Sequence, residues 1–138
     1  MKRQRIEKIV STWLPRFAKE LCLTNYMFNI EYKETEDSYM ECVALDKYLE
    51  ATITINPARF KSTAQVISVL RHELLHLLHA PYDDCVTEIC SYFKDEGHRA
   101  IMMNFSRIYT EKLVTLYERF LDRDFKYLRN HQFNIEED

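Results

Sequence analysis

Val69-Leu70-Arg71-His72-Glu73-Leu74-Leu75-His76-Leu77-Leu78 is the stretch that decides how this chain is interpreted. Its two histidines are four residues apart, so one helical turn places both imidazoles on the same side of a helix. The remaining positions are apolar except for Arg71 and Glu73. A charged glutamate between apolar turns is costly unless something compensates it. The pattern therefore predicts a buried helix whose polar residues serve chemistry.

The same helix carries the residues of a candidate metal site. His72 and His76 have the spacing needed to bind one ion, and two histidines with a carboxylate suit Zn²⁺. Glu73, beside the first histidine, can take a proton from a water that attacks a carbonyl and pass it to the leaving amine. This is the H-E-x-x-H arrangement of metallopeptidases. The alternative is a core helix with two unrelated histidines.

A catalytic zinc usually has three protein ligands and an open position for water. Glu88 is the candidate third ligand, because it lies four residues after the expected cap Asp84 while His76 lies five residues before Pro81, and two helices folding back would bring them together. His98, beside the single glycine, is the main alternative. The long pattern with a glycine and a third histidine after His76 is absent, since those two positions hold His79 and Tyr82.

Length and composition favour one domain spanning residues 1–138, because 46% apolar residues are enough for a core. The net charge of -3 gives no positive field for nucleic acid. No segment is long and apolar enough for a membrane span, and the N-terminus does not resemble a secretory signal. With four cysteines and no Cys-x-x-Cys pair, we expect reduced thiols and a cytoplasmic protein.

Hydrophobic periodicity predicts an α+β fold. An amphipathic helix is expected over residues 5–23, with a kink or break near Leu14 caused by Pro15. Three short strands are expected, followed by a helix capped by Ser62 or Thr63 and stopped by Pro81. Asp83 or Asp84 would cap the next helix, Gly97 would mark another break, and a long helix would follow from about Arg99. The expected strands are residues 26–32, 41–45 and 51–55.

The segment from residue 26 to residue 93 resembles small zincin-like metallopeptidases, in particular short phage and prophage metallopeptidase domains. The resemblance rests on the strand at residues 51–57, on the run from His72 to Pro81, and on a glutamate in the following helix. It implies a gluzincin-type site with Glu88 as the ligand. It also implies that residues 51–55 form a sheet edge that lines a cleft for a peptide or protein substrate.

Two other functions compete with a peptidase. A zincin fold could hold a structural metal, lack catalysis and serve as a binding module, although a structural site needs no general base such as Glu73. A nucleic-acid-binding helix is the second alternative, but Lys112 and Arg119 are interleaved with Glu111 and Glu118, which is typical of a solvated helix face. The oligomeric state, the substrate and the biological pathway stay open from the sequence.

Overall fold

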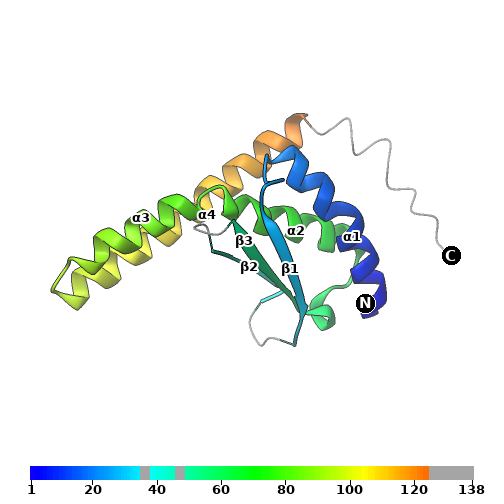
Figure 1. Cartoon of the computed structure of the whole chain (residues 1–138), viewed down its shortest axis with the longest axis horizontal. Helices are drawn as coiled ribbons and strands as arrows, with labels where there is room; N and C mark the ends of the chain where they lie inside the picture. Colours follow the sequence, from blue (N-terminus) through cyan, green and yellow to red (C-terminus); the bar gives the residue numbers. More distant parts are fainter. Residues whose placement is uncertain (35–37, 46–48, 125–138) are drawn as a thin grey trace.

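The computed structural model describes residues 1–34, 38–45 and 49–124. It confirms the α+β class expected from the sequence, with an N-terminal helix, three strands and then helices (Figure 1). The elements in chain order are α1 (Arg3–Glu20), β1 (Met27–Tyr32), β2 (Met40–Leu45), β3 (Glu50–Ile55), a 3-10 turn η2 (Pro57–Arg59), α2 (Thr63–Leu77), α3 (Ala80–Ser91) and α4 (Glu96–Asp124).

The three strands form a mixed sheet in the order β1-β3-β2. β1 runs parallel to β3, and β2 runs antiparallel to it, so that Ile53 lies between Ile30 and Cys42. The implication that residues 51–55 form a sheet edge is therefore wrong, because β3 has a hydrogen-bonded strand on each side. β2 is an edge strand of this sheet, and it packs against α2.

The core lies between one face of the sheet and the helices α1 and α2. Alternate residues of β3 point into it: Ala51, Ile53 and Ile55 are buried, whereas Thr52 and Thr54 are partly exposed. This is the period-two pattern of a sheet with one covered face. The buried side chains of α1 meet those of α2 in the same cluster. They are Ile6, Ile9, Val10, Trp13, Leu14, Phe17 and Ala18.

Two prolines act differently from the sequence-based expectation. α1 continues through Pro15 without a break. Pro15 is exposed, so water can reach the carbonyl that its missing N–H would have paired. Pro81 lies in the first turn of α3, where a proline costs no helical hydrogen bond. Asp83 and Asp84 are not caps, because α3 begins before them with His79 at the N-cap position.

The start of α2 was predicted correctly: the hydroxyl of Ser62 accepts a hydrogen bond from the N–H of Gln65. The chain does not reverse at Pro81, however. It reverses after α3, where Asp95 accepts a hydrogen bond of 2.8 Å from the N–H of His98 at the start of α4. Gly97 lies inside the first turn of α4 rather than at the break.

The helices α3 and α4 form an antiparallel hairpin that extends away from the sheet (Figure 1). α4 then passes back along α2, so residues far apart in the sequence lie close together. Leu75, Cys90 and Val114 are buried on these helices, outside the cluster that α1, α2 and the sheet share. None of the helices within the described residues has the length and apolar character needed to cross a membrane. All four cysteines are free.

Candidate metal centre

His72 and His76 converge on one point beside α2. Their Nε2 atoms are 3.2 Å apart, and both rings are partly buried. Two imidazole nitrogens bound to a tetrahedral zinc at 2.0–2.1 Å lie about 3.3 Å from one another. The spacing of the two Nε2 atoms is therefore compatible with two ligands on a single metal ion.

The carboxylate of Glu111 completes a possible metal-binding group. It reaches the histidines from α4, with Oε1 3.5 Å from Nε2 of His76 and Oε2 3.8 Å from Nε2 of His72. One ligand atom from each of the three residues lies within 4.8 Å of the other two. Two histidines and one carboxylate form a donor set that zinc accepts readily. The group resembles the H-E-x-x-H site with a distant glutamate found in zincins.

Glu118 lies behind His72. Its Oε1 is 3.3 Å from Nδ1 of His72, on the side of the ring away from the other histidine and Glu111. Glu118 follows Glu111 by seven residues, which is close to two helical turns, so α4 presents both carboxylates to α2 from one face. A carboxylate at Nδ1 keeps the proton on that nitrogen and leaves Nε2 free for a metal.

Glu73 points toward the edge of the sheet. Its Oε2 accepts a hydrogen bond of 3.2 Å from the backbone N–H of Cys42 in β2. Burial is the main reason that the pKa of Glu73 rises to about 7, and the nearby Glu111 and Glu41 raise it further, while His72 and the Cys42 N–H lower it. In the metal-free protein this carboxyl group therefore gains and loses its proton near neutral pH.

Burial also shifts the pKa values of two titratable groups near Glu73. Burial lowers the pKa of His76, so its neutral form, the one that binds metals, is favoured. Burial and the charge of Glu73 raise the pKa of the Cys42 thiol to about 12. In the metal-free protein Cys42 therefore stays a neutral thiol.

Glu88 and His98, the two residues considered from the sequence as third ligands, lie outside this group. Glu88 is exposed on α3. His98 is 74% exposed at the start of α4, where its Nδ1 is 3.2 Å from Asp95. The helical rise puts it about 20 Å along α4 from Glu111. The structure brings Glu111, and not Glu88, to the two histidines. A ligand set that includes Glu88 stays a prediction that this geometry does not support.

The reason lies in the path of the chain. Because Pro81 is accommodated in the first turn of α3, that helix continues away from α2 and carries Glu88 outward. The returning helix α4 supplies the carboxylates instead. Glu111 and Glu118 were interpreted from the sequence as part of a solvated, charge-interleaved face. Their spacing of seven residues on one face of a helix was the available signal.

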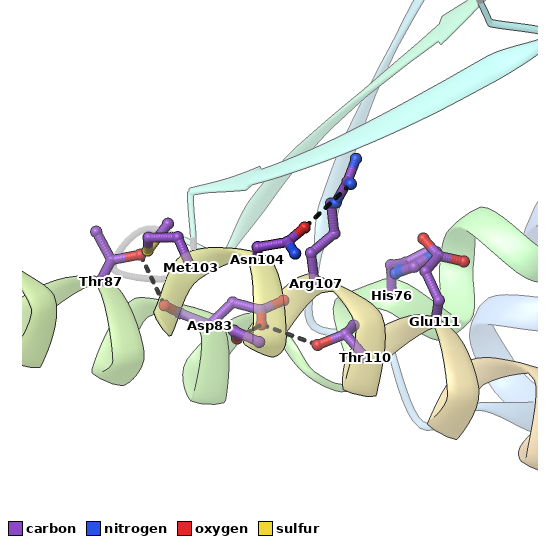
Figure 2. A pocket seen from close by; sticks show the side chains of 9 residues that line it. His76, Asp83, Thr87, Met103, Asn104, Arg107, Thr110 and Glu111 are labelled. Atoms are coloured by element: carbon purple, nitrogen blue, oxygen red, sulfur yellow. Dashed lines mark hydrogen bonds and ion pairs between the residues drawn. The ribbon is translucent and has the colours of Figure 1, made fainter. Parts of the chain in front are cut away.

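A cavity of about 440 Å³ lies next to the metal-binding group. His76 and Glu111 form one end of it, and Asp83, Thr110 and Met103 continue it along the hairpin (Figure 2). Arg107 stands at its rim beside Asn104, to which it donates a hydrogen bond of 3.4 Å. The cavity therefore runs from His76 and Glu111 along the hairpin.

In comparisons with known proteins, no family model, no curated protein and no solved structure matches the chain. What the chain shares with zincins is the arrangement of His72, His76 and Glu111.

Proposed function

We propose that this chain is a zinc-dependent peptidase whose metal ligands are His72, His76 and Glu111. The observation that carries the proposal is the convergence of Glu111 on two histidines that flank a largely buried glutamate. Three protein ligands would leave a position open, which a catalytic zinc requires and a structural zinc lacks. That favours a peptidase over a binding module with a structural metal.

When bound, zinc would supply a Lewis acid that polarises a peptide carbonyl and makes water nucleophilic at neutral pH. Glu73 would take the proton of the attacking water, because it directly follows the ligand His72 on the same helix. It would then give that proton to the leaving amine. The Cys42 N–H would hold the carboxylate of Glu73 in place during both transfers.

The positions of the other residues support the same assignment. Glu118 would keep His72 in the tautomer with a free Nε2. The cavity beside His76 and Glu111 would hold part of a peptide or protein substrate. Figure 2 shows Arg107 at that cavity, so a negatively charged group of the substrate would find a partner there.

The test is the variant Glu73→Gln in zinc-loaded protein, assayed with a denatured protein mixture as substrate. Loss of a general base lowers the rate by about 10² to 10⁴-fold. We expect that loss together with an unchanged zinc content, because Glu73 is not among the ligands. Full peptidase activity in Glu73→Gln would rule out the proposed role of this residue. Zinc bound without any activity in the unmodified protein would favour the binding module.

A further inference from the structure

The outer side of α4 carries a line of large apolar side chains that stay exposed. Their spacing is three, four, four, three and four residues, which is an 11-residue repeat. At 100° per residue they fall within a sector of about 80°, so they form one straight seam along the helix. The members of this α4 seam, each between 38% and 62% exposed, are Met102, Phe105, Tyr109, Leu113, Leu116 and Phe120.

α3 adds exposed apolar side chains to the same face of the hairpin. Tyr82 is 52% exposed and Ile89 is 49% exposed, and they lie on one side of α3 because they are two turns apart. Around the axis of each helix, the exposed stripe lies roughly 110–130° from the side that contacts the other helix. Because the rotation is equal in both helices and the helices are antiparallel, the two stripes lie on the same face of the hairpin.

The metal-binding carboxylates lie on the opposite side of α4. Glu111 and Glu118 are about 160–180° around the helix from the centre of the α4 seam. The apolar face is therefore separate from the candidate metal centre and from the adjoining cavity. Nothing that covers this face would block access to the histidines.

The exposed area of the apolar face is comparable with that of a protein–protein interface. An aromatic side chain offers about 150–250 Å² when fully exposed. Tyr82, Phe105, Tyr109 and Phe120, each a little over half exposed, thus present roughly 450 Å² together. The aliphatic residues of the two stripes extend the face toward the ~800 Å² that each partner buries in a standard interface. An apolar face of this size is comparable with the largest apolar patch of a typical monomer, and such patches often mark interaction sites.

We infer that this face pairs with the same face of a second copy of the chain. None of the seam residues is charged, and a regular repeat on a long helix is complementary to itself when two copies meet around a two-fold axis. Two hairpins then form a four-helix arrangement that buries both α4 seams. The two metal centres lie on the outside of the dimer, one per chain.

The test is the mass of the full chain in solution, measured by light scattering and sedimentation from about 1 to about 100 µM. A dimer has twice the 16.7 kDa of one chain. Phe105→Glu and Tyr109→Glu each place a charge in the middle of the α4 seam, so each raises the dimer dissociation constant by roughly 30-fold or more. The matched control is Val43→Glu, since Val43 is 53% exposed on β2, away from the hairpin.

Far-UV circular dichroism is expected to stay unchanged in all three variants, because each replaced side chain is already more than half exposed. Zinc content is also expected to stay unchanged, which separates this pairing from the proposed peptidase function. A monomer throughout the concentration range would overturn the pairing. A dimer that dissociates in Val43→Glu but stays intact in Phe105→Glu and Tyr109→Glu would also overturn the pairing.

Discussion

Glu73 is the residue on which the electrostatics of the site depend most. It is mostly buried, and it is hydrogen-bonded to the Cys42 N–H. In the absence of a cation, burial favours its protonated form. A bound zinc would reverse this preference, because a divalent charge nearby stabilises the carboxylate.

The raised pKa of Glu73 gives the metal-free protein a pH-dependent stability. The folded pKa of about 7 exceeds the ordinary 4.5, so the unfolded chain loses this proton first as the pH rises. We expect the free energy of unfolding to fall between pH 4.5 and pH 7, by up to about 3 kcal/mol for a shift of about 2.5 units. Urea unfolding of chelator-treated protein, with Glu73→Gln as reference, measures this difference.

Glu73→Gln is the right reference because it keeps His76, whose lowered pKa changes stability in the opposite direction near pH 6. The two proteins are expected to diverge as the pH rises, with the glutamine variant the more stable one at pH 8. A stability difference that stays constant from pH 4 to pH 8 would contradict the raised pKa.

Glu118 differs from Glu111 in the atom that it approaches. It contacts Nδ1 of His72, whereas Glu111 faces both Nε2 atoms. We expect Glu118→Gln to lower zinc affinity by about 10 to 100-fold without abolishing binding, as other outer partners of histidine ligands do. Competition with a zinc chelator measures the affinity. Complete loss of zinc binding in both Glu118→Gln and Glu111→Gln would show that Glu118 is itself a ligand.

The sequence could predict His72, Glu73 and His76 because their relation is local. One helical turn fixes it whatever the rest of the chain does. Glu111 comes from a helix 35 residues further along the sequence, and its position depends on where the chain reverses. Apart from its seven-residue spacing from Glu118, nothing local to Glu111 distinguishes it from the other charged residues of α4.

At the scale of the elements, Asp83 connects the hairpin to the site. Its Oδ1 accepts hydrogen bonds from Thr110 at 3.1 Å and from Ser106 at 3.4 Å, and Thr110 is buried directly before Glu111. This contact fixes the rotation of α4 relative to α3. It therefore helps to aim Glu111 at the histidines on α2.

We expect Asp83→Ala to lower the free energy of unfolding by about 1–3 kcal/mol, because it leaves the buried Thr110 hydroxyl without its acceptor. Zinc affinity is expected to fall as well, since Glu111 loses its support. Asp83→Asn, which keeps an acceptor oxygen, is the control. It is expected to lose less stability and less zinc affinity than Asp83→Ala. Chemical unfolding and zinc titration of the two variants provide the measurements. Equal effects in both variants would mean that the charge, and not the hydrogen bond, matters.

The elements themselves were largely predictable, and their arrangement was not. Alternating residues marked the three strands, and Ser62 marked the start of α2. Strand order is a non-local property, however, so the sequence did not show that β3 lies in the middle of the sheet. Pro81 was misleading for a related reason, because a proline can begin a helix as readily as it can end one.

Over the residues that the structure describes, the molecule consists of a core built from α1, α2 and the sheet, and a hairpin built from α3 and α4. The candidate metal centre lies where the two meet, with its histidines on α2 and its carboxylate on α4. A metal bound there would tie the returning helix to the core. Binding to the folded state alone raises stability by mass action.

We expect zinc at about 100 times its dissociation constant to raise the free energy of unfolding by about 2.7 kcal/mol. For a chain of this length that is a rise in Tm of roughly 5–10 °C. Hydrogen exchange in α4 is expected to slow at the same time, because α4 is the element that the metal holds. Differential scanning calorimetry and exchange mass spectrometry test both effects. A rise in Tm without added protection in α4 would place the metal elsewhere.

The most direct measurement is the zinc content of the full chain beside three alanine variants, at His76, Glu111 and Glu88. Glu111 and Glu88 are both exposed helical glutamates, so Glu88→Ala is a matched control. We expect about one zinc per chain in the unmodified protein and in Glu88→Ala, and loss of zinc in His76→Ala and Glu111→Ala. Zinc lost in Glu88→Ala but kept in Glu111→Ala, or no zinc uptake by the unmodified protein, would contradict the site described here.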